Sequence, residues 1–529
     1  LATVVDAVSY ANFANRCNAP QAVQLAEECV TRSIKLLQAT IAHKTLASSN
    51  DALCAVYLMG MFGVLLSPQV PTETYLAHSR GAKALLQLRS IDEFFIDRHS
   101  GRVCELIVWQ LMIIALHHGI TPLIPTADIV VMQKYVAAVS GSSSATLLLL
   151  VHREAELHAR WHETKHSLDP PRSRADLCQF LQTALELDAD FQLWESTVPS
   201  GWRYQMERNT AHARATYDPK WRDLFLGSRG SPQEIHTYSK LKRCWTWVFY
   251  RTTRILVLRD LLEILNWMFK LPPIDEFVNL HPHSPPSQSS KRTSIALDNA
   301  SLQINHGFAT THLVNMVEKS TAAMFGIFNV SVYGKIDQDL VGMRGYQMTW
   351  PLGIIDAVLK LGFVPDSGAL ATPPHSNAPS PNLPKHSINT TMPSQATFIT
   401  RDNPQISFHS QGSSIAPQAN DSSRILSSAA QNYPSPSSSQ ISFPPSPKSK
   451  LHVFDTSPTH PFDYPTNLSS PEMAITKLAR IDVAARREWL NRISYFVATE
   501  FGIKTAIAVP ASEGFLEVCK KQVEELIAH

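Results

Sequence analysis

The stretch HTYSKLKRCWTWVFYRTTRILVLRDLLEILNWMF, residues 236–269, decides the fold class. Its apolar side chains recur at steps of three and four residues, which is the spacing of one face of an α-helix. The members of this pattern are Leu241, Trp245, Val248, Thr252, Ile255 and Leu262. A segment this long and this periodic predicts one long helix or a slightly kinked pair of helices.

Helical periodicity continues on both sides of this stretch. It predicts a helical hairpin over residues 22–66 and further helices over 73–88, 105–117, 174–197 and 310–328. The apolar runs 52–66 and 106–116 predict helices buried on nearly all sides, because both are shorter than the ~20 residues that a bilayer span needs. Runs of β-branched residues at hairpin spacing do not occur in the sequence. We therefore predict an all-α fold of many helices, with no membrane segment.

Residues 366–470 have a different composition, in which Pro, Ser, Asn, Gln and Thr dominate. Such a segment buries too little apolar surface to offset its chain entropy, so it is predicted to be a disordered Ser/Pro-rich insertion. After it, an apolar stripe predicts a helix that packs back on the body. The stripe consists of Leu478, Ile481, Ala485, Trp489, Ile493 and Phe496. The predicted organisation is a helical body over 1–365 with a polar break at about 281–294, a linker over 366–470 and C-terminal helices over 471–529.

Composition excludes several classes of partner. Charged residues make up 17% of the 529 residues, below the typical ~25%, and the net charge is +2. A balance so near zero gives no overall field to steer the chain onto nucleic acid or an anionic membrane. The seven cysteines lack metal-knuckle spacing, which favours a reducing compartment over a disulfide framework. Because the first residue is Leu, we expect the chain to be a piece of a longer protein.

One short motif fits a zinc enzyme. HETKH, residues 162–166, matches H-E-x-x-H, in which His162 and His166 would hold zinc and Glu163 would act as base. Lys165 stands inside the motif and Pro170 ends the helix soon after it, which favours a solvated helix end rich in His. A zinc metallohydrolase is therefore a remote alternative, and we predict no catalytic residue, no metal ligand and no enzyme.

Two further patterns have a functional and a plain interpretation. Basic residues interleaved with aromatic ones could contact nucleic acid, but they more often form the solvated face of a helix whose other face is core. They are Lys240, Lys242, Arg243, Arg251, Arg254 and Arg259, and no DNA contact is predicted for them. In the linker, Ser446 and Ser457 precede Pro. This pattern is as typical of phosphorylation sites as it is of simple low complexity, so both interpretations stay open.

Several segments together resemble the C-terminal regulatory region of fungal zinc-cluster (Zn2Cys6) transcription factors. AHSRGAKALLQLRS (77–90) resembles that family's H-x-x-G-A-x-x-L-L-x-x-R helix, and LWESTVPSGWRY (193–204) its W…P…W-x-Y turn. CWTWVFYRTTRILVL (244–258), MRGYQMTWPLGII (343–355) and REWLNRISYFVATEFGIKTA (487–506) are similar to its later elements. The matching residues are His78, Gly81, Ala82, Leu85, Leu86, Arg89, Trp202, Trp247, Tyr250, Arg251, Arg254, Arg344, Gly345, Trp350, Pro351 and Trp489.

The resemblance implies a large multi-helix regulatory domain, a nuclear location and a role in RNA polymerase II transcription. Its implied partners are the transcription machinery or co-regulators, and a second copy in a homodimer. The family's cysteine cluster, which binds zinc and DNA, is missing from this sequence. DNA binding and zinc are therefore expected only through a segment outside it. The alternative is a helical scaffold of the same descent without a transcriptional role.

Overall fold

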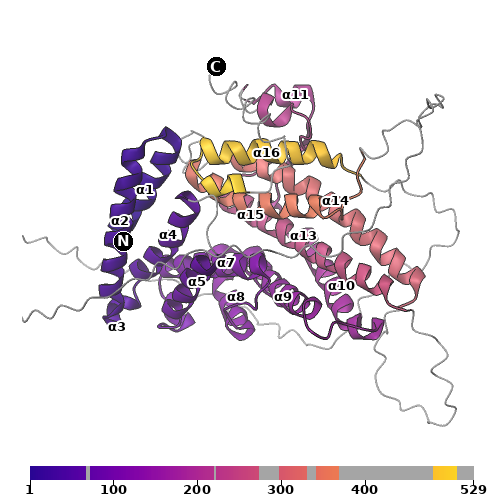
Figure 1. The fold of residues 1–529 in the computed structure, drawn as a ribbon, viewed down its shortest axis with the longest axis horizontal. Helices are drawn as coiled ribbons and strands as arrows, with labels where there is room; N and C mark the ends of the chain where they lie inside the picture. The colour runs from indigo at the N-terminus through magenta and orange to yellow at the C-terminus, as the bar shows by residue number, and fades with distance from the viewer. Residues whose placement is uncertain are drawn as a thin grey trace, which may run out of the picture. The chain divides into compact units, whose positions relative to one another are not determined.

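The computed structural model describes residues 1–66, 72–217, 219, 222–272, 297–330, 341–367 and 480–508, all of which belong to one compact unit. Helices dominate throughout (Figure 1), which confirms the all-α prediction. The strands of the described part are β1 (Gln205–Arg208) and β2 (Glu234–Thr237), an antiparallel pair that the sequence did not predict. The polar break at 281–294, the linker from residue 368, and Ser446 and Ser457 lie outside the described residues.

The chain runs through the following elements in order. The first are α1 (Ala2–Cys17), α2 (Pro20–Ile41), α3 (Lys44–Ala47), α4 (Asn50–Leu66), α5 (Thr72–Leu86), α6 (Ile91–Phe94) and α7 (Arg98–His118). Next come α8 (Thr126–Ser140), α9 (Ser142–Lys165), α10 (Arg174–Thr197), η1 (Ser200–Trp202), α11 (Ala211–Arg214) and η2 (Arg222–Leu226). The last are α13 (Leu241–Lys270), α14 (Asn299–Asn329), α15 (Val341–Lys360), α16 (Val483–Thr499) and η6 (Lys504–Ala508).

Helix α13 lies at the centre of the unit and packs against α9, α10, α14 and α15. It forms the single long helix that the sequence predicted, but it begins at Leu241, because residues 234–237 pair with β1 instead. The hydrophobic cluster that includes α13 is continuous from Ala11 in α1 to Ala506 in η6. The helices therefore share one apolar interior.

Helix α16 lies against α15 (Figure 1) and also contacts η2. The indole N–H of Trp489 donates to the carbonyl oxygen of Phe225 at 2.7 Å. Before this helix, Ile481 exchanges backbone hydrogen bonds with Pro365 and Ser367, so these described residues, which are far apart in sequence, lie side by side. We predicted an amphipathic helix here, but α16 is buried on nearly all sides, polar residues included.

A loop after η2 approaches α16 closely at Gly230. Its φ of +78° is a backbone conformation that favours glycine, and a Cβ at this position would lie 1.8 Å from the carbonyl oxygen of Ala485. Only a residue without a side chain fits here, so this contact depends on glycine.

At the other end of the molecule, α1 and α2 pair with each other and with α4 (Figure 1). Asn15 donates from its side chain to the carbonyl oxygens of Leu65 and Gly502, and Asn12 donates to that of Phe501. These bonds tie the first helix to the segment that follows α16.

One described helix, α7, is long and apolar enough to cross a membrane, and 67% of its most apolar window is buried inside the protein. A single helix of this kind is a weak indication of a membrane span, because core helices of soluble proteins have the same composition.

Candidate functional site

The residues that carry the first motif, 77–90, join α5 to the start of α4. Five of them lie on α5: His78, Gly81, Ala82, Leu85 and Leu86. Arg89 follows the helix, and its guanidinium donates to the carbonyl of Ser48 and the side-chain oxygen of Asn50, both at 3.1 Å. The same group lies 3.7 Å from the centre of the Phe94 ring. Because burial lowers the pKa of His78, its neutral form is favoured, as expected of a packing residue.

The next two motifs meet at the start of α13. The indole N–H of Trp247 donates to the carbonyl oxygen of Trp202 at 2.8 Å. One turn later the hydroxyl of Tyr250 donates to Glu195 at 2.9 Å, while its ring stacks on Trp194. These contacts fix the turn after α10 against the central helix.

The last two motifs pack against each other through α15. Arg344 donates to the carbonyl oxygens of Phe328 and Val330, which end α14. Gly345 leaves room for Phe501, because a Cβ there would lie 2.7 Å from that side chain. The Trp350 ring is 4.9 Å from that of Phe249 on α13. Pro351 stands inside α15, next to Trp350.

The HETKH segment lies at the C-terminal end of α9, where His162 and His166 are exposed. The ring centres of these two residues are 4.5 Å apart, and Nδ1 of His166 is 2.8 Å from the carbonyl oxygen of His162. Lys165 forms an ion pair with Glu263 at 2.6 Å. Over the part of the chain that the structure describes, His, Cys, Asp and Glu side chains form no group of three that could hold a metal ion. The geometry therefore gives the zinc alternative no support.

Arg251 and Arg254 of α13 are buried, which corrects the prediction of a solvated face for these two, whereas Lys240 and Lys242 are exposed and Arg243 and Arg259 are partly exposed. Arg251 is fully buried and donates to the hydroxyl of Tyr238 at 2.8 Å. Arg254 forms an ion pair with Asp188 on α10 at 2.7 Å. The pattern failed because the partners are distant in sequence, and periodicity does not show them. These guanidinium groups are used inside the protein and do not form a nucleic-acid surface.

A buried ionic cluster links α10, α13 and α14. Asp188 accepts from Arg254 and lies 3.0 Å from Nδ1 of His312. Burial by itself would raise the pKa of Asp188, but the hydrogen bond from His312 and the charge of Arg254 outweigh it, so the pKa is lowered. Glu195 is close by, at 3.1 Å from Lys319. The charges of this cluster compensate one another.

A second buried cluster joins α9 to α13. Asp260 lies 2.6 Å from Nδ1 of His158 and 2.7 Å from Arg259. Although burial opposes it, Arg259 and then His158 hold the pKa of Asp260 well below its usual range. Glu154 is fully buried beside them, and neither of its carboxyl oxygens has a hydrogen-bond partner among the described residues. Burial raises the pKa of Glu154, and the charge of Asp260 raises it further.

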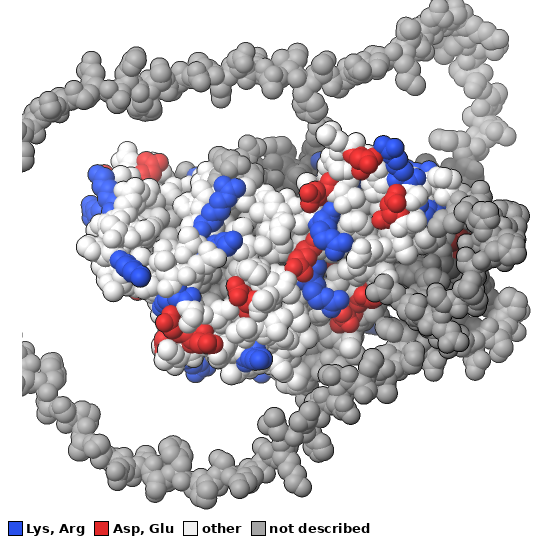
Figure 2. Space-filling view, turned by 90° about the horizontal axis from the view of Figure 1, so that it is seen from below, with Lys and Arg blue, Asp and Glu red and all other residues white. Residues whose placement is uncertain are grey.

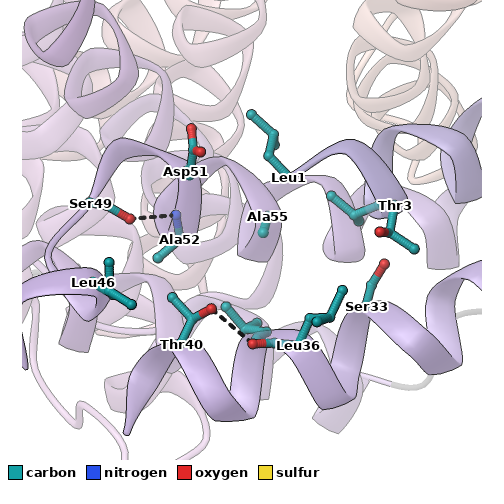
Figure 3. Close-up of a pocket in the computed structure, with 12 residues that line it drawn as sticks. Leu1, Thr3, Ser33, Leu36, Thr40, Leu46, Ser49, Asp51, Ala52 and Ala55 are labelled. Atoms are coloured by element: carbon teal, nitrogen blue, oxygen red, sulfur yellow. Dashed lines mark hydrogen bonds between the residues drawn. The ribbon is translucent and has the colours of Figure 1, made fainter. Parts of the chain in front are cut away.

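Between the N-terminal helices lies a pocket of about 270 Å³ (Figure 3). Its walls come from α1, α2, the short α3 and the start of α4. Apolar side chains make up more than half of its lining: Leu1, Val4, Leu36, Leu37, Leu46, Ala52 and Ala55. The polar members are Thr3, Ser33, Thr40, Ser49 and Asp51. None of the motif residues and none of the buried ion pairs lines this pocket.

Charges on the surface are mixed. Figure 2 shows one face, on which Lys and Arg side chains lie among Asp and Glu side chains, with wide uncharged areas between them. That face has no field of one sign, in agreement with the net charge of +2.

Comparison with known proteins gives no relative: no family model, no curated protein and no solved structure matches this chain. The fold and the residues described above therefore carry the functional argument.

Sequence reasoning missed the acids of both buried clusters and the pocket. Asp188 and Asp260 lie inside long helices where other charged residues are also close in sequence, Glu186 and Asp190 for the first and Arg259 for the second, so no local signal separates the buried acids from exposed ones. For the pocket there is no local signal either, because its lining comes from four helices.

Proposed function

We propose that this chain is the regulatory and interaction region of a fungal transcription factor that acts in the nucleus on RNA polymerase II transcription. The observation that carries the proposal is the role shared by the motif residues. In segments spread from residue 77 to 506, the motif arginines and tryptophans make hydrogen bonds and ring contacts that join one helix or turn to another, some neighbouring in sequence and some distant. Motifs that share an architectural role across nearly the whole chain support descent from one fold type.

The proposed region acts by binding and not by catalysis. Apart from Glu154, the acids and bases of the two buried clusters are engaged with one another in ion pairs between helices. Partners would be the transcription machinery or co-regulators, and a second copy of the chain in a homodimer. Contact with DNA, and any zinc, would require a cluster that lies outside this sequence.

A reporter assay tests the proposal. The full chain is fused to a foreign DNA-binding domain, and expression of a reporter with the matching sites is measured in a fungal host. We expect a clear rise or fall relative to the DNA-binding domain alone. Trp489→Ala should abolish this effect, because it removes a buried side chain that joins α16 to η2. A folded nuclear fusion without effect would contradict the proposal and favour the helical scaffold.

Metal analysis of the purified chain distinguishes the regulatory proposal from the remote alternative, a zinc metallohydrolase. Stoichiometric zinc that is lost in a His162→Ala, His166→Ala double variant would support the metallohydrolase and count against the regulatory proposal. The regulatory proposal predicts a chain that purifies without bound zinc.

A further inference from the structure

We propose that the free edge of strand β1 binds an extended, acidic segment of a partner protein, which joins the β1–β2 sheet as a third strand. This inference is independent of the proposed function, since it depends on the strand alone and can be tested without transcription. Three features of β1 lead to it: an exposed edge, unused backbone groups and the charge around them.

The first feature is the contrast in burial between the two strands. In β2, Ile235 and His236 are buried, and this strand packs against α14. All four residues of β1 are exposed, and the side chain of Met206 is 59% exposed. Within the described part of the chain, β2 is the one strand that pairs with β1. The sheet is therefore anchored through β2, and the other edge of β1 faces solvent.

The register shows which residues of β1 use their backbone groups within the sheet. In an antiparallel pair, every second residue exchanges hydrogen bonds with the neighbouring strand, and the residues between point their N–H and C=O groups the other way. Asn209 donates its backbone N–H to the carbonyl oxygen of Gln233 at 2.9 Å, in the register that continues from β1. Two and four residues earlier, Glu207 and Gln205 are therefore also bonded to β2.

The second feature is the set of backbone groups that remain. By the same alternation, Met206 and Arg208 direct their N–H and C=O groups to the free edge. The carbonyl oxygen of Arg208 accepts from the backbone N–H of Thr210 at 2.8 Å. The N–H and C=O of Met206 and the N–H of Arg208 have no hydrogen-bond partner among the described residues. An extended chain satisfies such groups by adding a strand to the edge.

The third feature is charge, which selects among extended segments. A short edge with charged side chains resists pairing with apolar strands. Basic residues outnumber acidic ones by five to two in the sheet and the residues around it, 203–208 and 234–243. The basic ones are Arg203, Arg208, Lys240, Lys242 and Arg243, and the acidic ones are Glu207 and Glu234. Because a second copy of this edge would carry the same excess, an acidic segment of another protein fits it better.

Arg208 is the cation on the edge itself. Lys242 forms an ion pair with Glu105 at 3.1 Å, whereas the exposed Arg208 makes no ion pair with a described residue. Residues directly opposite each other on neighbouring strands lie on one face, where opposite charges attract. In an antiparallel segment, an acidic residue opposite Arg208 and an apolar residue opposite Met206, two positions later, therefore complement the edge.

The test uses the peptide acetyl-TVDTVTV-amide, whose aspartate would lie opposite Arg208 and whose second valine would lie opposite Met206. Binding to the full chain is followed by saturation-transfer NMR. We expect saturable binding, which weakens by about twofold to fivefold when the aspartate is replaced by lysine. No saturable binding, or equal binding of the lysine peptide, would overturn the proposal.

Two N-methylated peptides test the mode of binding. N-methylation of the second valine removes the N–H that would donate to Met206, and it should weaken binding by about tenfold or more. N-methylation of the threonine before that valine changes an N–H that points away from β1, and binding should persist. Equal effects of the two changes would overturn the addition of a strand, and this comparison needs no variant of the protein.

Two variants locate the site. Met206→Pro removes an outward N–H and no bond between β1 and β2, so the unfolding temperature should be kept while peptide binding is lost. Arg208→Ala should weaken binding by about twofold to fivefold, and Arg102→Ala, at an exposed position of α7, should leave it unchanged.

Full binding by the folded Met206→Pro variant would overturn the proposal. So would a dimer of the wild-type chain that Met206→Pro converts to a monomer, because the edge would then belong to a second copy. A chain that binds the peptide but has no effect on the reporter would contradict the proposed function alone.

Discussion

The central helices and the N-terminal helices of this protein bury their side chains very differently. Helix α13 buries 20 of its 30 residues, among them tryptophan, phenylalanine and three charged residues. Helix α2 buries three of 22, namely Ala22, Ala26 and Ser33. Meanwhile the N-terminal layer, α1 to α3, leaves large apolar side chains exposed: Val5, Tyr10, Phe13, Leu25, Ile34, Leu36, Ile41 and Leu46.

This contrast separates a rigid frame, made of α13 and the helices α9, α10, α14 and α15 that pack against it, from a weakly held N-terminal layer, α1 to α3. Burial of apolar area stabilises by about 25 cal/mol per Å², so interfaces made of alanine contribute little, whereas interfaces of aromatic residues contribute much. Around α13 the buried ion pairs also fix which helix lies against which, because each charge must meet its partner. Regions with few buried contacts open at low free energy, and binding sites are often drawn from them. The pocket lies in the weakly held layer.

The largest expected effect comes from truncating a phenylalanine in the frame, compared with the same change in the N-terminal layer. Phe249 is 1% exposed and lies against Trp109 and Trp350, whereas Phe13 is 53% exposed. Phe249→Ala should lower the free energy of unfolding by about 3–5 kcal/mol, and Phe13→Ala should change it by less than about 0.5 kcal/mol. Denaturant unfolding measures both. Similar losses for the two variants would remove the distinction between frame and layer.

A smaller effect concerns Glu154 in the frame. Burial, and then the charge of Asp260, raises its pKa above the ordinary 4.5, so the folded protein keeps a proton that the unfolded chain releases. The contribution of Glu154 to stability is therefore full below pH 4.5 and is lost as the pH rises through the pKa of the folded state. Glu154→Gln should remove this decline and leave the protein about 1–3 kcal/mol more stable than wild type at alkaline pH.

The measurement for Glu154 is denaturant unfolding at pH 5 and pH 9. Glu163→Gln, on the exposed end of the same helix, is the control for removal of a carboxylate. An unchanged pH dependence in the Glu154→Gln variant would show that this carboxyl group does not titrate in the folded protein as its burial implies.

The smallest expected effect lies in the N-terminal layer. Asn15 donates to the carbonyl oxygens of Leu65 and Gly502, so Asn15→Ala removes two hydrogen bonds that hold α1. We expect a loss of about 1 kcal/mol, confined to the local opening of α1. Hydrogen exchange should become faster in α1 and stay unchanged in α13. Gln21→Ala, an exposed change on α2, is the control, and equal acceleration in α13 would mean that the layer unfolds together with the frame.

Part of the fold was accessible from periodicity. The helix predicted over 174–197 has the same limits as α10, and its capping residue, Ser173, accepts from the backbone N–H of Asp176 as such a residue should. Helices α1, α8 and α15 were not predicted, and of α9 only the His-rich C-terminal end was. Helix α1 is rich in alanine, and α9 contains the apolar run 147–151 in its first half, so neither shows a clear alternation of polar and apolar faces. The pair β1 and β2 was missed because its register is fixed by pairing between residues at least 26 positions apart, from Arg208 with Glu234 upward.

By itself the sequence determined that this protein is helical, because helix formation depends on neighbours three and four residues apart. Only the tertiary structure decided which charges are buried and where a pocket remains. Arg254 is compensated by Asp188, 66 residues away, and the pocket needs side chains from four helices at once. Burial and compensation depend on residues brought together by folding, and local patterns do not contain them.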